Sequence, residues 1–302
     1  MNKMLLSIII PVYNVEPWLR ECLNSVCAIP CDDWEAIIVD DGSLDASGRI
    51  LDNYSNDSRL TIIHTPHKGV SCARNEAFKH ASGDYIAFLD GDDYLDPEET
   101  ARMIDRLRDD DDIVTGSYRI IFDGDNDARP DRRHTFKNGL RSNGRDFILN
   151  HYISASAVIW RSFYRRNLII PFHEGVRFED VEWSIQVYRS ATSIVCIDVP
   201  FYYYRRRKGS ITSSKVDAAT LADACAVCDT MMLKAADLQN DKAIARMYER
   251  NALHLAIHTA FSAFKTISRD ERRKFRSFLQ GKKTSGLRYT VILAISKFIF
   301  SF

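Results

Sequence analysis

Aspartates cluster at two points of the sequence, and each cluster directly follows a short apolar run. The first is Asp40–Ser43 (Asp-Asp-Gly-Ser) and the second is Asp90–Asp93 (Asp-Gly-Asp-Asp). In extended backbone, residues two apart point to the same side, so Asp90 and Asp92 can converge on one point. Convergent carboxylates repel each other unless a cation lies between them, and oxygen ligands suit Mg²⁺ or Mn²⁺. The second cluster therefore predicts a divalent metal site, and the alternative is an Asp- and Gly-rich turn.

A third acidic cluster, Phe178–Asp180 (Phe-Glu-Asp), stands at the start of a helical pattern. Acidic residues there are ordinary caps and partners of the helix dipole, worth about 0.3–1 kcal/mol each. Because the pKa of an unperturbed aspartate is about 3.9 and a helix N-terminus favours the charged form, we expect Asp180 to be ionised at neutral pH. Spacing alone does not overturn this capping role.

Five apolar segments in the first 115 residues have the length and composition of buried strands. They are Leu5–Ile10, Trp34–Val39, Leu60–His64, Tyr85–Leu89 and Ile113–Thr115. Helical patterns separate the first four and precede the fifth, and Asp96–Glu99 (Asp-Pro-Glu-Glu) is a typical helix start with Asp96 as its N-cap. This alternation predicts an α/β fold, with a Rossmann-like, mostly parallel sheet and helices on both faces. Ligands of such sheets bind beyond the carboxyl ends of the strands, where both aspartate clusters lie.

The strand pattern loosens after residue 115. The segment Gly116–Gly144 is polar and rich in Asp and Arg, which indicates a loop or an irregular strand, and Asp109–Asp112 is expected to be a solvated helix end. Two further short strands are expected, at Ile194–Ile197 and Phe201–Tyr204. The sequence is helical after Ser214. We therefore expect two regions, an α/β domain over residues 1–213 and a helical C-terminal region over residues 214–302.

Charge is divided unevenly along the 302 residues, although the net charge of the chain is zero. The part from Phe201 to Phe302 carries 19 Lys and Arg against 8 Asp and Glu, a net charge of +11, so the preceding part carries −11. An acidic body with a basic tail fits a metal-using enzyme at an anionic surface. The tail ends in the apolar segment Val291–Phe302, which is shorter than the about 20 residues that a bilayer span needs. It can lie in the membrane interface or pack as a terminal helix, and the sequence leaves both open.

The cysteines and the N-terminus indicate the compartment. The seven cysteines are scattered and odd in number, which favours reduced thiols over a disulfide framework. The opening residues lack the pattern of a signal peptide. We therefore expect a cytoplasmic protein, with peripheral attachment to the inner face of the cell membrane as the option that the tail adds.

Five motifs occur in the order and spacing of the family 2 glycosyltransferases, which the chain resembles over roughly Leu5 to Ser213. They are Pro11–Asn14 (Pro-Val-Tyr-Asn), Asp40–Ser43, Gly69–Asn75 (Gly-Val-Ser-Cys-Ala-Arg-Asn), Asp90–Asp93 and Phe178–Asp180. Five motifs in order are far more specific than any one of them. The resemblance implies a GT-A fold, a UDP-sugar donor, and an inverting reaction that depends on Mn²⁺ or Mg²⁺.

The resemblance also implies how the nucleotide base would be bound. Pro11 and Tyr13 would flank the nucleotide, and Asp41 would accept a hydrogen bond from N3–H of uracil. His67 stands where the family often has Asn.

Further roles follow for the charged residues. Asp90 would approach the ribose or the diphosphate, Asp92 would ligate the metal, and Asp180 would be the general base. The remaining contacts to the nucleotide sugar would come from Arg74 of the third motif and from a run that resembles the family's Tyr-Arg-x-Arg-x-x-Ser loop, with Arg205, Arg207 and Ser210.

These features predict an inverting, metal-dependent glycosyltransferase of the hexosyl or N-acetylhexosaminyl type. Positive groups would stabilise the leaving diphosphate, while the acceptor hydroxyl attacks from the opposite face and gives its proton to Asp180. The expected acceptor is a glycan or lipid-linked glycan in surface polysaccharide biosynthesis, and no nucleic acid partner is expected. Two alternatives stay open, a nucleotidyltransferase, which would use similar aspartates but no base at a sugar carbon, and a catalytically silent scaffold subunit that binds nucleotide sugars. The donor sugar, the acceptor and the linkage depend on loops that carry no readable code.

Overall fold

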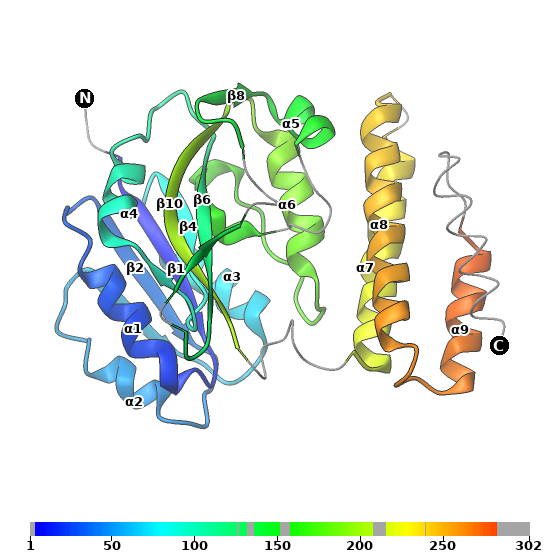
Figure 1. Ribbon diagram of the computed structural model, residues 1–302, viewed down its shortest axis with the longest axis horizontal. Coiled ribbons are helices and arrows are strands. Elements are labelled where there is room, and N and C mark those ends of the chain that lie inside the picture. Colours follow the sequence, from blue (N-terminus) through cyan, green and yellow to red (C-terminus); the bar gives the residue numbers. More distant parts are fainter. Residues whose placement is uncertain are drawn as a thin grey trace.

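A ten-stranded sheet forms the centre of the structure, a computed structural model that describes residues 4–125, 127–131, 136–151, 158–207, 216–238 and 240–282 (Figure 1). The strand order is β3-β2-β1-β4-β9-β6-β10-β5, with β7 paired to β6 and β8 paired to β10. Its strands are β1 (Leu6–Val12), β2 (Trp34–Asp40), β3 (Leu60–His64), β4 (Tyr85–Phe88), β5 (Tyr94–Leu95), β6 (Ile113–Phe122), β7 (Arg129–Pro130), β8 (Leu140–Ser142), β9 (Ser162–Arg165) and β10 (Ile194–Arg206).

The first four strands are parallel, as the sequence predicts. Every residue of β1 is buried, and β2 is nearly so, because helices cover both faces of the sheet there and leave no polar face. Strand β1 lies between β2 and β4, so the chain changes direction across the sheet at β1. The carboxyl ends of these strands meet at one edge, and a ligand site is expected in the crevice beside that change of direction.

The second half of the sheet differs from the sequence prediction. Strand β6 continues for seven residues beyond Thr115, so part of the expected loop is strand. The two expected short strands form one long strand, β10, whose register to β6 shifts around Pro200, because proline cannot donate a ladder hydrogen bond. Strand β9 was not predicted, and it runs antiparallel to both β4 and β6. The sheet is therefore mixed, with a parallel N-terminal half.

Helices flank the sheet on both faces, with α1 and α4 on one face and α3 on the other (Figure 1). They are α1 (Glu16–Cys27), α2 (Ser47–Asp52), α3 (Val70–His80), α4 (Pro97–Ile104), α5 (Gly144–Asn150) and α6 (Glu179–Ser190), with short 3-10 turns η1 (Ile159–Arg161) and η2 (Arg166–Leu168). The predicted start of α4 is confirmed, since the Asp96 carboxylate accepts from the Glu99 N–H at 3.0 Å and Pro97 is the first helical residue.

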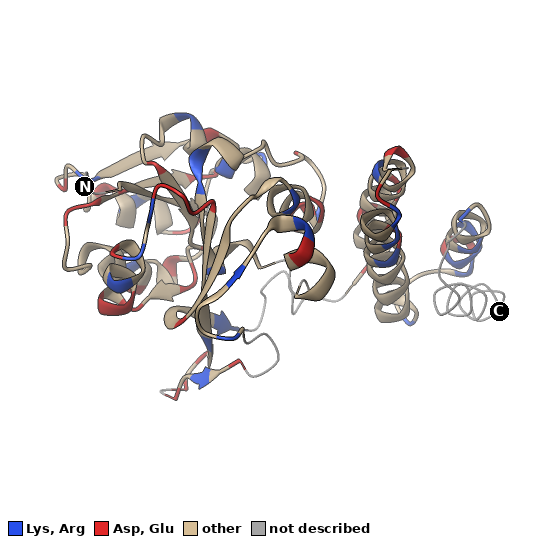
Figure 2. Cartoon of the chain, turned by 90° about the horizontal axis from the view of Figure 1, so that it is seen from above, with Lys and Arg blue, Asp and Glu red and all other residues tan. Residues whose placement is uncertain are grey.

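Three further helices follow the sheet, α7 (Ala218–Asp237), α8 (Lys242–Ala263) and α9 (Arg269–Gln280). Helices α7 and α8 lie side by side and stand against α5 and α6, with Arg145 paired to Asp241 at 2.6 Å and Lys234 to Glu182 (Figure 1). Figure 2 shows Lys and Arg gathered on the helix nearest the C-terminus, α9. None of the helices in the described ranges is both long and apolar enough to cross a membrane. The segment Val291–Phe302 lies outside the described residues.

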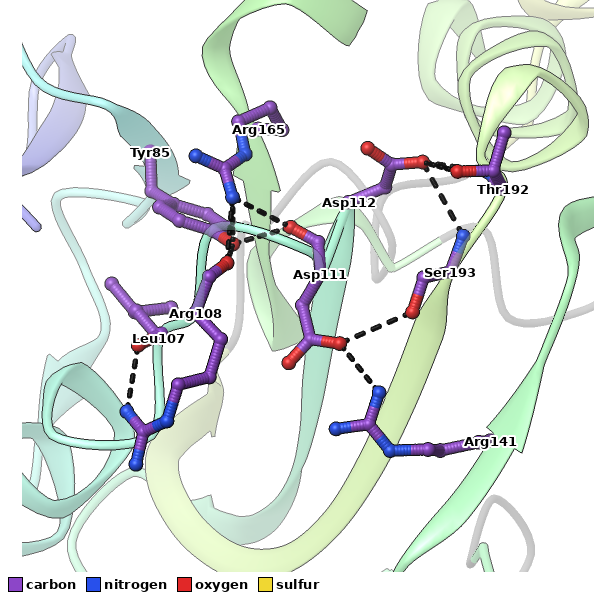
Figure 3. A network of polar contacts seen from close by, with 9 residues as sticks. All are labelled: Tyr85, Leu107, Arg108, Asp111, Asp112, Arg141, Arg165, Thr192 and Ser193. Carbon is purple, nitrogen blue, oxygen red and sulfur yellow. Dashed lines mark hydrogen bonds and ion pairs between the residues drawn. The ribbon is translucent and has the colours of Figure 1, made fainter.

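A polar network holds the opposite edge of the sheet together (Figure 3). The carboxylate of Asp111 accepts from Arg141 at 2.7 Å and from the Ser193 hydroxyl at 3.1 Å, and it is 2 % exposed. Asp112 accepts from the Thr192 N–H at 2.6 Å. The expectation of a solvated helix end is therefore wrong for this pair, because their side chains tie the start of β6 to the segment before β10. Tyr85 joins the network through its hydroxyl, which donates to the Arg108 and Asp111 carbonyls.

We expect Asp111→Ala to lower the free energy of unfolding by about 1–3 kcal/mol, because Ser193 and the end of Arg141 lose a buried charged acceptor. Urea denaturation measures the change. Asp109→Ala is the matched control, since the Asp109 side chain is 86 % exposed and its loss should change stability by less than about 0.5 kcal/mol. Equal effects of the two substitutions would contradict a structural role for the network.

Candidate active site

The loops after β1 and β2 are joined to each other at the carboxyl edge of the sheet. The Asp41 N–H donates to the Val12 carbonyl at 2.8 Å, and the Asn14 N–H donates to the Ser43 hydroxyl at 3.0 Å. Asn14 has a left-handed backbone, with φ of 50°, and its side-chain oxygen accepts from the Leu44 N–H at 2.7 Å. The first two motifs of the sequence therefore form one surface.

The Asp41 side chain is only 4 % exposed, and it organises the loop before α3. Its Oδ1 accepts from the Lys68 N–H at 2.8 Å, and its Oδ2 accepts from the Gly69 N–H at 2.8 Å. Gly69 has φ of 98°, a conformation that favours glycine. The Nδ1 atom of His67 also lies 2.8 Å from Oδ2. Both oxygens of Asp41 therefore have donors in this structure.

Tyr13 and His67 form a stacked pair beside Asp41. Their ring centroids are 4.0 Å apart and their planes differ by 15°. Tyr13 is 39 % exposed, whereas Pro11 is buried in β1 below Gly91, where an added Cβ would lie 3.2 Å from the Pro11 carbonyl oxygen. The glycine of the second aspartate cluster thus allows that loop to pass close over β1. Pro11, Tyr13 and Asp41 lie on neighbouring strand ends, as the parallel order requires.

Arg74 on α3 joins the second and third acidic clusters. Its Nη2 lies 3.0 Å from Asp90 Oδ1, and its Nη1 lies 2.8 Å from Glu179 Oε1. The side chains of Arg74 and Glu179 are 7 % and 10 % exposed, and that of Asp90 is 31 % exposed. The guanidinium also lies over the Phe172 ring at 5.3 Å. One buried cation thus links the loop after β4 to the first turn of α6, although the two segments are far apart in sequence.

Asp180 is the second residue of α6, next to Glu179, and its side chain is partly buried. The residue before the helix, Phe178, has φ of 64° and gives no side-chain cap. Burial, together with the charge of Glu179, raises the pKa of Asp180 to about 7, and Arg74 acts in the opposite direction. The expectation that the helix N-terminus keeps Asp180 ionised at all neutral pH values is therefore wrong, because desolvation outweighs the helix dipole here. A carboxyl group that titrates near pH 7 is well suited to proton transfer.

The three aspartates of the second cluster have different surroundings. Asp93 is buried and accepts from the Tyr202 hydroxyl at 2.6 Å and from the Arg205 N–H at 2.7 Å, so it shapes the turn. Asp92 is partly exposed, and its Oδ2 accepts from Arg207 Nε at 2.7 Å. Burial and the charge of Asp90 raise the pKa of Asp92. The two carboxylates thus repel each other, as a site for a cation requires.

The second cluster fits a divalent cation as a partial ligand set. Carboxylate oxygens are the ligands that Mg²⁺ and Mn²⁺ prefer, and Mg²⁺ takes one or two of them together with phosphates and water. Within the described ranges, no group of three or more His, Cys, Asp or Glu side chains could hold a metal ion by itself. Water and the phosphate oxygens of a bound ligand would complete the coordination of a metal at Asp92.

Arg205 and Arg207 of the late loop both contact the segment that carries Asp92. Arg205 is 7 % exposed, donates from Nε to the Asp92 carbonyl at 2.9 Å and pairs with Glu21, so it holds the loop in place. Arg207 lies over the Trp18 ring at 4.2 Å and bonds the Asp92 carboxylate. Ser210 lies outside the described residues.

The roles of three residues of this site were not predicted. Glu179 is the second anchor of Arg74, His67 covers Tyr13, and Tyr202 stacks on Trp160 with ring centroids 4.2 Å apart while it bonds Asp93. The alternation of Tyr202 with Tyr204 along a strand was a usable signal, since residues two apart share a face. The other two depend on contacts between distant segments.

Comparisons with known proteins find similar sequences and folds. Residues 7–168, more than half of the chain, match the family described as Glycosyl transferase family 2. EpsJ of Bacillus subtilis (strain 168), described as an uncharacterized glycosyltransferase, is 34% identical over 222 residues, 69% of this chain and 63% of EpsJ. The minor teichoic acid biosynthesis protein GgaA of the same organism is 29% identical over 67% of this chain and 47% of its own length. The chain thus spans less than two thirds of these relatives.

A solved structure gives the same result for the fold. The crystal structure of S. aureus TarS 1-349 in complex with UDP-GlcNAc has a TM-score of 0.68 at 23% identity, over 91% of this chain and 80% of that chain. The predicted GT-A fold with a helical C-terminal extension is confirmed.

We expect Arg74→Met to lower the free energy of unfolding by about 3 kcal/mol, because it leaves the nearly buried Glu179 without its cation. Since Arg74 lowers the pKa of Asp180, that pKa should also rise in the variant. Urea denaturation and a titration of labelled aspartates by NMR measure the two effects. Lys79→Met on the same helix is the control, because Lys79 is 68 % exposed and pairs with Glu76 of the same helix. A variant as stable as wild type would contradict the bridging role.

Proposed function

The chain belongs to glycosyl transferase family 2, and from this premise we propose that it transfers a hexosyl or N-acetylhexosaminyl group from a UDP-sugar to a hydroxyl of a glycan or lipid-linked glycan. The observation that carries the proposal is the Arg74 bridge, which joins Asp90 of the second cluster to Glu179, the neighbour of Asp180. The complex of TarS with UDP-GlcNAc supports the donor class, and the name of GgaA supports a role in surface polysaccharide biosynthesis.

The donor would lie across the carboxyl ends of β1, β2 and β4. Tyr13 would offer its ring to the base, Pro11 would flank the nucleotide, and Asp41 would offer the acceptor for N3–H of uracil. Arg207, which bonds the Asp92 carboxylate, would pair with the diphosphate, together with Ser210. Arg74 and Asp90 would line the ribose and diphosphate side. Arg205 would act by holding the loop that carries Arg207.

The chemistry would rest on separated charges. A Mn²⁺ or Mg²⁺ ion on Asp92 would supply positive charge to the diphosphate when bound. Arg207 would release Asp92 and turn to the leaving phosphate, where its charge stabilises the transition state. Asp180 would take the proton of the acceptor hydroxyl as that oxygen attacks the anomeric carbon from the face opposite the diphosphate. One base and no enzyme nucleophile give inversion of the anomeric centre.

The direct test follows nucleotide release from a panel of nucleotide sugars with Mn²⁺, Mg²⁺ or EDTA. We expect UDP release from a UDP-sugar that EDTA abolishes. Asp92→Ala should lose the metal dependence of UDP binding and keep the fold, because the side chain is partly exposed at a strand end. Asp96→Ala, at the N-cap of α4, is a control that removes an aspartate from the same region without touching the proposed ligand. UDP binding by Asp92→Ala that still responds to Mn²⁺ would refute the metal assignment.

Asp180→Asn should bind the donor like wild type and transfer more slowly by about 10²–10⁴-fold, because the amide cannot take a proton. In wild type the rate should rise about tenfold per pH unit up to about pH 7 and then level off, since only the ionised base is active. The variant should lack this rise, which separates a glycosyltransferase from a nucleotidyltransferase.

A stability measurement controls for misfolding of Asp180→Asn. The pKa of Asp180 is raised from an unfolded value of about 3.9, so ionisation of Asp180 costs folded-state stability as pH rises from 4 to 7. The uncharged asparagine avoids this cost, and we expect the variant to be at least as stable as wild type at pH 8. Undiminished transfer by a folded variant would return Asp180 to a helix-capping role.

We place residues 1–213 as the catalytic domain and residues 214–302 as a peripheral membrane contact at the inner face of the cell membrane. Helix α9 begins with a capping box at Ser268 and exposes Arg269, Arg273 and Lys274, while Phe275 and Leu279 are buried. Basic residues near an anionic surface contribute about 1 kcal/mol each, and the apolar end of the chain adds burial in the interface.

Vesicle sedimentation tests the membrane proposal. The full chain should prefer anionic over neutral vesicles, and the preference should weaken as salt rises, because charges are screened over about 8 Å at physiological ionic strength. Removal of residues 286–302, or the pair Arg273→Glu and Lys274→Glu, should release the protein without loss of donor hydrolysis. The pair Lys79→Glu and Arg102→Glu on the α/β body is the charge-matched control. Equal binding to both vesicle types at low salt would refute a membrane role.

A further inference from the structure

The imidazole of His67 makes two contacts that resemble those of a nucleobase. Its ring lies flat on Tyr13, with a centroid distance of 4.0 Å and an interplanar angle of 15°. Its Nδ1 lies 2.8 Å from Asp41 Oδ2 and 3.1 Å from the Asp41 carbonyl oxygen. Both partners can only accept, so Nδ1 must carry the hydrogen.

The same two residues are those that the proposed donor site assigns to uracil. Uracil would present a flat ring to Tyr13 and the N3–H group to the Asp41 carboxylate. His67 presents a flat ring to one face of Tyr13 and an N–H group to the same carboxylate. The tyrosine face and the carboxylate oxygen that His67 uses therefore cannot serve His67 and a base at the same time.

We propose that His67 is a built-in competitor of the nucleobase and that it sets the affinity of this site for uridine nucleotides. The inference rests on the proposed function, since it takes Tyr13 and Asp41 as the base-binding pair. A uridine nucleotide binds by displacing the imidazole from both contacts, and its N3–H replaces the Nδ1–H on Asp41.

The surroundings of His67 allow this exchange. Its side chain is 52 % exposed, so it can turn into solvent without leaving a cavity in the core. Asp41 keeps its other two donors, the N–H groups of Lys68 and Gly69, while the side chain moves. In the exchange, the stack and the hydrogen bond of His67 are replaced by a stack and a hydrogen bond of the base. The buried Asp41 carboxylate therefore never loses all its partners.

Competition of this kind has a calculable effect. The apparent affinity falls by the fraction of molecules in which the site is open. A stack and a hydrogen bond that together favour the closed form by one or two kcal/mol make that factor about 5- to 30-fold. His67→Ala should therefore bind UDP about 5- to 30-fold more tightly than wild type. Binding of inorganic pyrophosphate, which has no base, should not change.

Isothermal titration of UDP and pyrophosphate in the presence of Mn²⁺ tests this, with His64→Ala as the matched control. His64 is similarly exposed, at 47 %, and its Nδ1 lies 3.0 Å from Asp40 Oδ2. In the described part of the chain, the ring that stacks on Tyr13 is that of His67 and not that of His64. Its removal should leave UDP binding unchanged. His67→Phe should gain less than His67→Ala, because a ring can still cover Tyr13 without donating to Asp41.

A second measurement uses the wild-type protein. In ¹⁵N-histidine-labelled protein, the Nδ1–H signal of His67 should lose its protection from exchange when UDP is added. Unchanged or weaker UDP binding by His67→Ala, or an Nδ1–H signal that UDP leaves unchanged, overturns the inference while the proposed function stands. If neither wild type nor any variant binds UDP, the proposed function itself fails and this inference falls with it.

Discussion

The ion pairs of Arg74 are the interaction on which the rest of the site depends. Asp90, Asp92, Glu179 and Asp180 are gathered at one edge of the sheet, and without cations their mutual repulsion and desolvation would oppose this arrangement. Arg74 meets two of them and lies on the helix that follows the Asp41-organised loop, so it couples the loops after β2 and β4 to α6. Arg207, which follows β10, neutralises Asp92. A ligand that brings phosphates and a metal therefore enters a site that already contains compensating charge.

The parts of this site that the sequence predicts are those fixed by strand order. Asp41 follows β2 and Asp90 follows β4, and both strands are parallel neighbours of β1. The carboxyl ends of parallel strands lie at the same edge of the sheet, so both aspartates are expected at that edge. What the sequence does not predict are contacts made across elements. The enclosure of Asp41 by Lys68 and Gly69, the Glu179 end of the Arg74 bridge, and the burial of Asp111 depend on side chains from segments dozens of residues apart. Strand β9 is missed because its four residues carry no period long enough to read.

Asp180 shows how a rule that is correct for an exposed residue can give a wrong expectation for a desolvated one. A helix N-terminus does favour a carboxylate, by an amount of about 0.3–1 kcal/mol when the group is exposed. The same residue is desolvated here and stands beside Glu179, and these two effects are larger. The helix start was readable from the sequence, whereas the desolvation of Asp180 was not. The outcome for function is favourable, since a base with a pKa of about 7 holds a transferred proton better than one of about 3.9.

His67 and Asp180 act on different steps, which follows from where they lie. Contacts to the base are the same in the UDP-sugar, in the transition state and in the released UDP, so a competitor at the base changes all three equally. Such a uniform change in binding free energy alters KM and the rate of product release, but it does not change the rate of the chemical step. Asp180 is needed only while the acceptor oxygen attacks. The stacked pair of Tyr13 and His67 therefore tunes how long the nucleotide stays, and the network of Arg74, Glu179 and Asp180 determines what happens to the sugar during that time.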